Sequence, residues 1–252
     1  MHPIFISLGS FQIHWYGVCM AIGFLLSLWT MRRLGRGTHR NADYISNLLT
    51  LLVLSALGGA RALYVAENWT AQFAAHPWQA LNFREGGLVF YGGLLTCWVS
   101  LTVFAIVHRE SHLDLLDFVI TALPVGHAAG RVGCFMEGCC YGCRTDGPLG
   151  VVYPPGSPAG PLPVYPTQLF ESALLLVIFA ILLHHYPRHR KGEQVALYAL
   201  LYATARFILE TFRNDPRSPV GPVTISQFIS LFIFAFGAGL MAWIHTRRKD
   251  AA

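Results

Sequence analysis

The segment GRVGCFMEGCCYG, residues 130–142, combines residue types that bind anions with residue types that react as nucleophiles. It contains Arg131, Glu137, three cysteines and four glycines between two apolar runs. A guanidinium group can grip two phosphate oxygens in one plane, and a thiolate is both a nucleophile and a metal ligand. This composition predicts a binding or reaction site, and its ligand depends on the elements that position it.

The elements that must position this segment are apolar helices. Of the 252 residues, 54% are hydrophobic and only 12% are charged, whereas soluble domains carry about a quarter charged residues. The apolar runs have the roughly 17 to 25 residues that a helix needs to cross a bilayer. We therefore predict an all-α polytopic membrane protein with one domain over residues 1–252. The seven predicted spans are 12–31, 44–66, 88–107, 113–130, 167–185, 194–212 and 222–245.

The fourth predicted span differs from the others. It is short, it contains Pro124 and Gly126, and it ends in the 130–142 segment. We expect a broken or partly inserted helix here, which is tolerated where protein or a polar cavity satisfies the freed backbone groups. The first twelve residues lack a basic leader and a small-residue cleavage site, so we expect no removable signal peptide.

The basic residues predict the orientation, because cytoplasmic loops carry an excess of Lys and Arg. With the N-terminus outside, eleven basic residues fall in inner segments and five in outer segments, which favours N-out and C-in. They lie in short clusters beside apolar runs, so the net charge of +5 suits membrane anchoring better than nucleic-acid binding. The inner residues are Arg32, Arg33, Arg36, Arg40, Arg109, Arg188, Arg190, Lys191, Arg247, Arg248 and Lys249, and the outer residues are Arg84, Arg131, Arg144, Arg213 and Arg217.

Polar side chains gather at the outer ends of the predicted spans, whereas the inner half shows only loop charges and apolar helix. Arginines, carboxylates and glutamines at one depth predict a cavity that holds an anion, and the natural anion at that depth is a phospholipid headgroup. Simpler explanations exist for single residues, such as an Arg206–Glu210 pair within one helix or Arg61 reaching the lipid headgroups. The gathered residues are His14, Trp15, Tyr16, Arg61, Glu67, Tyr91, Arg131, Gln168, Glu171, Arg206, Glu210, Arg213, Ser226 and Gln227.

Four cysteines follow the pattern C-x4-C-C-x2-C at positions 134, 139, 140 and 143. Three interpretations stay open: a metal site, a disulfide facing an oxidising compartment, and a catalytic thiol. A single cluster with adjacent cysteines lacks the second pair of a structural zinc site. Cys19 and Cys97 lie within spans and behave as small apolar residues. We find no metal or nucleotide motif and expect no cofactor. Residues 131–166, rich in Pro and Gly toward their end, are predicted to form an outer loop or lid.

Six motifs resemble those of the bacterial prolipoprotein diacylglyceryl transferases, in the same order and along almost the whole chain. They are SLGSFQIHWYG at 7–17, GGAR at 58–61, GGLVFYGG at 86–93, GRVGCF at 130–135, YPTQLFE at 165–171, and ARFILETFR at 205–213 followed by ISQ at 225–227.

The resemblance implies an enzyme of the bacterial inner membrane with its active site toward the periplasm. Such an enzyme transfers the diacylglyceryl group of phosphatidylglycerol to the lipobox cysteine of a prolipoprotein signal peptide and releases glycerol phosphate. It implies that 130–142 is a flexible hinge and that its cysteines are supports, because the nucleophile is the acceptor's thiol. The candidate catalytic residues are Arg131, Arg213, Tyr91, His127 and Tyr16, and the candidate substrate-binding residues are His14, Arg61, Glu137, Gln168, Glu171, Arg206, Glu210 and Gln227.

The sequence departs from the family pattern at several positions. Tyr91 stands where many members have a histidine proposed as the base, and free tyrosine titrates near pH 10. The base is then His14, His127 or no protein group. Cys134 and Cys139 replace an asparagine and a glutamate, and Glu137 stands where an asparagine is usual.

Two other functions stay open. A related transferase could use the same lipid donor with a different acceptor, which these departures would fit. A transporter or receptor should instead show ionisable residues running through the midplane into the inner half, and the sequence shows no such relay.

Overall fold

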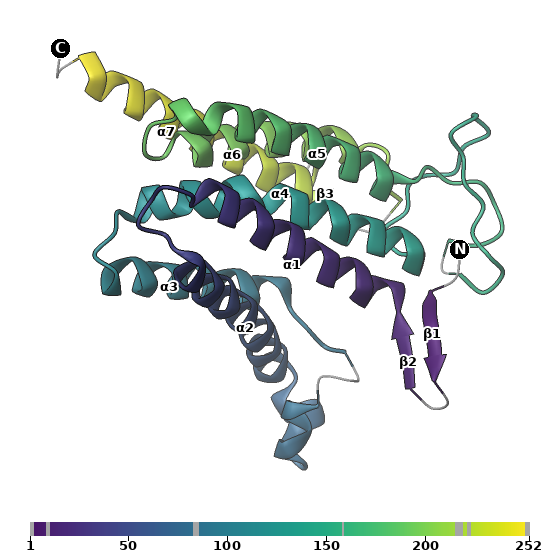
Figure 1. Cartoon of the computed structure of the whole chain (residues 1–252). Coiled ribbons are helices and arrows are strands. Elements are labelled where there is room, and N and C mark those ends of the chain that lie inside the picture. The colour runs from purple at the N-terminus through teal and green to yellow at the C-terminus, as the bar shows by residue number, and fades with distance from the viewer. Residues whose placement is uncertain are drawn as a thin grey trace. The chain divides into compact units, whose positions relative to one another are not determined.

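Long helices form most of the chain (Figure 1). The structure is a computed structural model of the chain, and it describes residues 3–8, 11–82, 86–157, 159–214, 219–220 and 223–249. The long helices are α1 (Trp15–Leu34), α2 (Ala42–Glu67), α3 (Phe90–Val107), α4 (His112–Glu137), α5 (Thr167–His185), α6 (Glu193–Glu210) and α7 (Ile225–Lys249).

The shorter elements lie at the ends of these helices. The strands β1 (Ile4–Leu8) and β2 (Phe11–His14) form an antiparallel hairpin in which Ile4 faces His14. The sequence analysis did not predict this hairpin. The remaining elements are η1 (Trp69–Phe73), η2 (Pro77–Leu81), η4 (Tyr186–Arg188), β3 (Pro219–Val220) and β4 (Val223–Thr224).

The all-α membrane architecture is confirmed. Each long helix begins within three residues of a predicted span, and six of the seven are long and apolar enough to cross a membrane. The exception is α6, which carries Arg206 and Glu210 near its C-terminal end. The orientation stays a prediction. Two of its outer residues, Arg84 and Arg217, lie outside the described residues, as do the side chains of Arg247, Arg248 and Lys249.

The expected break in the fourth span is wrong. α4 is a continuous helix of 26 residues that includes Pro124 and extends through Glu137. Neighbouring helices can satisfy the backbone around such a proline. Here Ser27 Oγ of α1 donates to Ala122 O at 3.2 Å, and Ser172 Oγ of α5 donates to Ala128 O at 3.0 Å. The hinge prediction for 130–142 therefore fails for its first eight residues, and the 131–166 loop begins only after Glu137.

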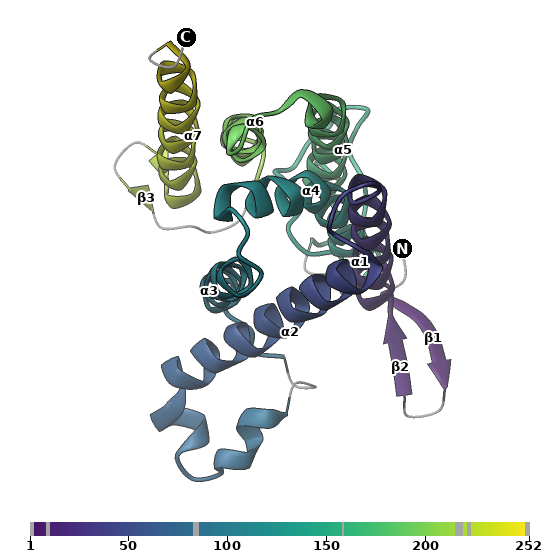
Figure 2. The same ribbon diagram turned by 60° about the vertical axis from the view of Figure 1, so that its left-hand side comes forward.

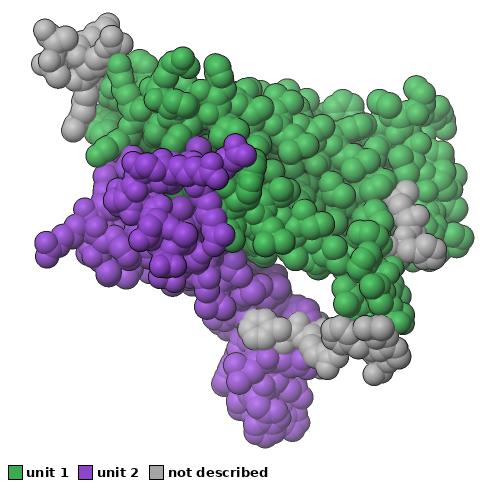
Figure 3. Space-filling model, viewed as in Figure 1, with its two compact units in different colours: residues 1–31, 117–252 green, residues 32–116 purple. Residues whose placement is uncertain are grey.

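The chain divides into two compact units, residues 1–31 with 117–252 (unit 1) and residues 32–116 (unit 2) (Figure 3). In unit 1, small residues let α4 pack closely against α1. A β-carbon added to Gly23 would lie 2.8 Å from Gly126 O, and one added to Gly133 would lie 3.1 Å from Cys19 Cβ. Further along the unit, α6 lies between α5 and α7 (Figure 2).

The N-terminal part of α4 fixes the start of α6. Asp117 is fully buried, and its carboxylate accepts hydrogen bonds from the backbone N–H groups of Gly192 and Val195. His189 Nε2 lies 3.7 Å from the same carboxylate. A carboxylate at a helix N-terminus stabilises the helix dipole and satisfies N–H groups that have no partner within the helix. The sequence predicted only loop charges and apolar helix in the inner half of the spans. This prediction is therefore wrong.

Unit 2 contains a second buried ion cluster. Arg40 binds the carboxylates of Glu110 and Asp114, and Tyr44 donates to Glu110. The helices α2 and α3 approach closely at Gly59, where an added β-carbon would lie 2.0 Å from Thr96 Oγ1.

Candidate functional site

A buried carboxylate, Glu171 at the start of α5, gathers polar groups from three helices of unit 1. Its Oε1 lies 3.0 Å from Arg131 Nη2 of α4 and accepts a hydrogen bond of 3.4 Å from Tyr202 OH of α6. Its Oε2 lies 3.9 Å from Arg213 Nη1, just beyond α6. His127, one turn before Arg131, places Nε2 3.9 Å from Oε1. The structure therefore brings together four of the predicted residues, which are separated by up to 86 positions in the sequence.

A second carboxylate extends this cluster toward α7. Glu210 Oε2 lies 2.9 Å from Arg206 Nη2, one turn earlier on α6, and Oε1 accepts a hydrogen bond of 3.1 Å from Thr224 Oγ1. Arg206 is also within electrostatic range of Glu171 and Arg213. The alternative of a simple Arg206–Glu210 pair within one helix is therefore incomplete, because the pair joins the larger group.

The arginine cluster comprises Arg131, Arg206, Arg213, Glu171 and Glu210. Within the described residues, its three guanidinium groups face two carboxylates. Among the described residues, the buried atoms Arg131 Nε and Arg206 Nη1 have no hydrogen-bond partner. Buried N–H groups are nearly always paired, and burying a charged donor without a partner is costly. A phosphodiester monoanion bound here would give these donors hydrogen-bond acceptors and a charge of opposite sign.

Backbone contacts hold the parts of this cluster together. Gly142 N donates to Tyr165 O at 2.8 Å, and Cys143 N donates to Phe212 O at 2.7 Å. These bonds tie the turn after α4 to the residues before α5 and after α6. The approach requires a glycine, because a β-carbon at Gly142 would lie 2.5 Å from Phe212 O. The turn thus links the helix that carries Arg131, near one carboxylate oxygen of Glu171, to the residues around Arg213, near the other oxygen.

Gln168 supports the same turn. Its Nε2 donates to Cys139 O at 2.5 Å and lies 3.0 Å from Tyr153 OH. Tyr153 is 2% exposed and packs edge-on against Phe135 of α4. Burial raises the pKa of Tyr153 to about 12. Gln168 was predicted to bind substrate, but in the structure its amide nitrogen holds protein groups.

The six cysteines are free thiols, so the structure contains no disulfide at 134, 139, 140 or 143. The thiols of Cys134 and Cys139 hydrogen-bond the sulfur of Cys140 and lower the pKa of Cys140, and the nearby guanidinium groups of Arg213 and Arg131 lower it further. The same thiol contacts raise the pKa of Cys139. Cys140 has a left-handed backbone, with φ of 63°, directly after the turn at Gly138.

Three predicted residues lie near the C-terminal end of α4. His14 Nδ1 is 3.6 Å from Glu137 Oε2, and both side chains are partly exposed. Tyr16, at the start of α1, packs against Gly133 and is within electrostatic range of Cys134 and Arg131. Among the described residues, their ion pairs and packing contacts are with one another and with α4, beside the arginine cluster.

Gln227 has a local structural contact instead. Its Oε1 accepts the N–H of Thr224 at 3.1 Å, and Thr224 Oγ1 accepts the N–H of Gln227 at 3.2 Å. This reciprocal pair is a capping box at the start of α7.

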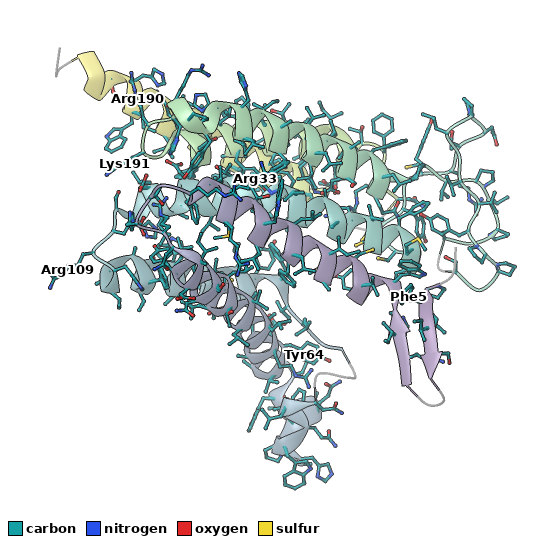
Figure 4. All side chains as sticks on the ribbon, in the orientation of Figure 1. Phe5, Arg33, Tyr64, Arg109, Arg190 and Lys191 are labelled. Atoms are coloured by element: carbon teal, nitrogen blue, oxygen red, sulfur yellow. The ribbon has the colours of Figure 1, made fainter. Side chains whose placement is uncertain are left out.

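Arg61 and Tyr91 belong to unit 2. The guanidinium group of Arg61 donates to the carbonyl oxygens of Gln79, Ala80, Gly86 and Gly87, so it holds the segment between η2 and α3. It also lines a cavity with Tyr64, which Figure 4 labels. Tyr91 is 59% exposed and contacts Phe90 edge-on. Within unit 2, neither residue contacts another predicted site residue.

Sequence reasoning missed Tyr202, Thr224 and Thr167. Tyr202 and Thr224 contact the two carboxylates of the cluster, and Thr167 Oγ1 donates to Cys140 O at 2.9 Å. Tyr202 lies one turn before Arg206 on α6, so helical spacing could have placed it on the same face. Thr224 could have been found from the Thr-x-x-Gln pattern that precedes α7.

Comparisons with known proteins agree with the motif order. The sequence profile described as prolipoprotein diacylglyceryl transferase matches residues 3–243. The chain is 34% identical over 233 residues to a phosphatidylglycerol--prolipoprotein diacylglyceryl transferase 2 of Clostridium perfringens, covering 90% of this chain and 89% of that one. It is 34% identical over 252 residues to the phosphatidylglycerol--prolipoprotein diacylglyceryl transferase of Legionella pneumophila, covering 95% and 96%. The enzyme of that name from Clostridium tetani is 30% identical over 240 residues, covering 94% and 95%.

Proposed function

The chain belongs to the prolipoprotein diacylglyceryl transferase family, and we propose that it transfers the diacylglyceryl group of phosphatidylglycerol to a cysteine thiol of a prolipoprotein. The finer features are part of the same proposal: the acceptor is the lipobox cysteine of the signal peptide, and the protein lies in the bacterial inner membrane with the arginine cluster toward the periplasm. The observation that carries the proposal is the buried surplus of guanidinium donors around Glu171.

The arginine cluster suits the donor lipid because a phosphodiester carries one negative charge. Arg131 keeps one buried donor, Nε, after its contact with Glu171, and Arg206 keeps Nη1 after its contact with Glu210. In the proposal, both donors bind phosphate oxygens of the lipid. Glu171 orients Arg131 without using all of its donors, so the guanidinium group is held in place before the lipid binds.

The same donors favour the reaction itself. The acceptor sulfur attacks the glycerol carbon that bears the phosphate oxygen, the C–O bond breaks, and both bonding electrons leave with glycerol phosphate. Negative charge grows on the phosphate as the diester becomes a monoester. Fixed donors aimed at developing charge lower the barrier, because they need no reorganisation at that moment. Arg131, Arg206 and Arg213 take this role in the proposal.

His127 lies beside the arginine cluster. Its Nε2 faces Glu171 at 3.9 Å, and its ring lies against Tyr202 with centroids 5.7 Å apart. In the proposal it receives the acceptor's proton or positions the headgroup. His14 is the alternative, because it pairs with Glu137 at the partly exposed end of α4.

The test is direct. The purified chain in nanodiscs containing phosphatidylglycerol, incubated with a lipobox peptide, should form a diacylglyceryl thioether and release glycerol phosphate, both measured by mass spectrometry. Nanodiscs of phosphatidylcholine alone should give no product. Arg131→Lys should lose about 100-fold in kcat/KM, or about 2.7 kcal/mol, because an ammonium group cannot make two parallel bonds to phosphate.

A matched control keeps the same chemical change away from the site. Arg188 is exposed at the opposite end of α5, so Arg188→Lys should leave kcat/KM unchanged. Near-normal turnover by Arg131→Lys would show that charge alone matters at position 131. In a bacterium depleted of its own transferase, a well-expressed copy that restores no lipid-modified lipoprotein would favour a different acceptor.

A further inference from the structure

Three thiols converge where α4 ends. The Sγ atoms of Cys134, Cys139 and Cys140 all lie within 4.8 Å of one another, and each residue is half-buried. Figure 4 shows sulfur atoms close together at this end of α4. In a tetrahedral zinc site the Zn–S distance is about 2.3 Å, which places ligand sulfurs about 3.8 Å apart. Small side-chain rotations would therefore close the three thiols around one ion.

We propose that Cys134, Cys139 and Cys140 bind one Zn²⁺ ion whose fourth position receives the thiol of the protein acceptor. The proposal rests on the proposed function, since it assigns the activation of that thiol. Thiolates are soft ligands that select zinc or copper(I) over hard cations. Three protein ligands with one open position are the pattern of catalytic zinc, whereas structural zinc has four.

The fourth cysteine of the motif is held away from this group. Cys143 Sγ donates to Arg213 O at 3.4 Å, and its backbone N–H donates to Phe212 O at 2.7 Å. It is not among the thiols that lie within 4.8 Å of one another. The C-x4-C-C-x2-C spacing therefore supplies three ligands and leaves one coordination position for a ligand from outside.

The backbone holds the ligands in place. Cys140 keeps its left-handed conformation at φ of 63°, which an L-residue adopts only when its surroundings impose it. Its carbonyl accepts from Thr167 Oγ1 at 2.9 Å, and the carbonyl of Cys139 accepts from Gln168 Nε2 at 2.5 Å. Thr167 and Gln168 are thus positioning residues for the thiols, which accounts for the buried amide of Gln168.

The charge balance places this metal beside the phosphate site. Zn²⁺ with three thiolates carries one negative charge, and Arg213 and Arg131 both lie within electrostatic range of Cys140. The guanidinium groups that bind the lipid phosphate therefore also compensate the metal–thiolate group. The acceptor thiolate and the phosphate leaving group would then both lie near the same arginines.

The step balances without an oxidant or reductant. An ion held by Cys134, Cys139 and Cys140 would lower the pKa of the acceptor thiol, so that the proton of this thiol would pass to solvent. Its sulfur attacks the glycerol carbon, a C–S bond forms, and the C–O bond breaks with its electrons on the phosphate oxygen. The product is a neutral thioether, a weaker ligand, and it leaves the metal. No protein base is then required, and of the two roles proposed for His127 the positioning of the headgroup remains.

The test uses the full chain, purified with a phosphine reductant and reconstituted in nanodiscs. Elemental analysis should find one zinc per chain, and Co²⁺ exchange should give a thiolate charge-transfer band with tetrahedral d–d bands. Cys134→Ser, Cys139→Ser and Cys140→Ser should each lose at least tenfold in Co²⁺ affinity. Cys143→Ser is the matched control from the same turn and should keep the spectrum.

A second measurement uses the wild-type chain, so it does not depend on whether the variants fold. A lipobox peptide with its cysteine should shift the d–d bands, whereas the same peptide with serine should not. Chelation of the zinc should slow transfer at least tenfold, and added Zn²⁺ should restore it.

Several results would overturn the inference: no bound metal, copper in place of zinc in protein purified from cells, a spectrum that also needs Cys143, or a peptide thiol that leaves the d–d bands unchanged. A disulfide among the three cysteines in cells would do the same. Full transfer by the zinc-free enzyme would refute the metal's role and leave the proposed function intact. A thiol-sensitive metal spectrum without any diacylglyceryl transfer would instead refute the donor in the proposed function.

Discussion

At one end of α4, Asp117 accepts two backbone N–H groups of α6 and lies near His189, whereas at the other end Arg131 meets Glu171, Arg213 and His127. The two charged residues are 14 positions apart on one helix, or about 21 Å. Asp117 has backbone N–H groups and a histidine as partners, and its carboxylate completes a helix N-terminus. Around Arg131, within the part of the chain that the structure describes, the guanidinium groups outnumber the carboxylates, and the buried donors Arg131 Nε and Arg206 Nη1 have no partner.

This difference separates two uses of buried charge. A charge whose contacts are all supplied by the fold contributes to stability, because removing it leaves buried partners unsatisfied. A charge with surplus donors costs stability until a ligand arrives, so it is retained for that ligand. The two ends of α4 should therefore respond in opposite ways to mutation.

The largest expected effect is on catalysis at Arg131. Arg131→Ala should lower kcat/KM about 1,000-fold, or about 4 kcal/mol, because it removes a fixed donor to the phosphate. Thermal unfolding in detergent should change little, since Glu171 keeps Arg213 and Tyr202. If Arg131→Ala lowered the unfolding temperature together with kcat/KM, Arg131 would have a role in stability like that of Asp117.

Asp117→Ala should give the opposite pattern. It leaves the N–H groups of Gly192 and Val195 without their acceptor in a buried place, which should lower the free energy of unfolding by about 3 kcal/mol. The transfer rate of the folded fraction should stay near that of the wild type. Denaturant titration with a parallel activity assay checks both, and a selective loss of activity would break the comparison.

Gly142→Ala tests whether the turn after α4 carries the geometry of the arginine cluster. The new methyl group would collide with Phe212 O at 2.5 Å, which should lower the free energy of unfolding by about 2 kcal/mol and shift Arg213. Gly239→Ala in α7 is the matched control. Nothing lies within 4 Å of its new methyl group, so it should stabilise the helix by up to about 1 kcal/mol. Equal melting temperatures for the two variants would contradict the role given to the turn.

The smallest expected effect is a pH dependence at Tyr153. Its pKa is raised to about 12 by burial, so the folded state favours the neutral phenol. The resulting stabilisation is complete below the unfolded pKa near 10 and is lost as the pH rises toward 12. Ultraviolet titration should show one tyrosinate that forms near pH 12 and is absent in Tyr153→Phe. Ionisation of that group near pH 10 would show that the loop does not bury it.

The helices could be predicted because each apolar run has the length needed to cross a bilayer. That length can be read from the run itself, without knowledge of contacts between distant residues. The continuity of α4 through Pro124 could not be predicted, because the contacts that α4 makes with Ser27 of α1 and Ser172 of α5 join residues that are distant in sequence. The contacts of Asp117 were missed for the same reason, since its partners lie 75 and 78 residues away.

The site was predicted as a set of residues but not as a set of contacts. Motif order identified Arg131, Glu171 and Arg213, and the structure joins them. Spacing could not show that Gln168 and Gln227 hold backbone groups, since an amide suits a ligand and a turn equally well. The convergence of three thiols also depends on the turn at 138–140, whose left-handed residue leaves no mark in the sequence when it is a cysteine.

The bonds from Gly142 and Cys143 to residues 165 and 212 have a consequence for how substrates are received. They link the end of α4, the start of α5 and the end of α6 into one frame, so the arginines cannot close around a lipid by moving independently. The entropic cost of ordering these side chains is met when the chain folds and not when the lipid binds. The lipid and the acceptor must then adjust their own conformations, and they should bind to a site whose geometry is already fixed.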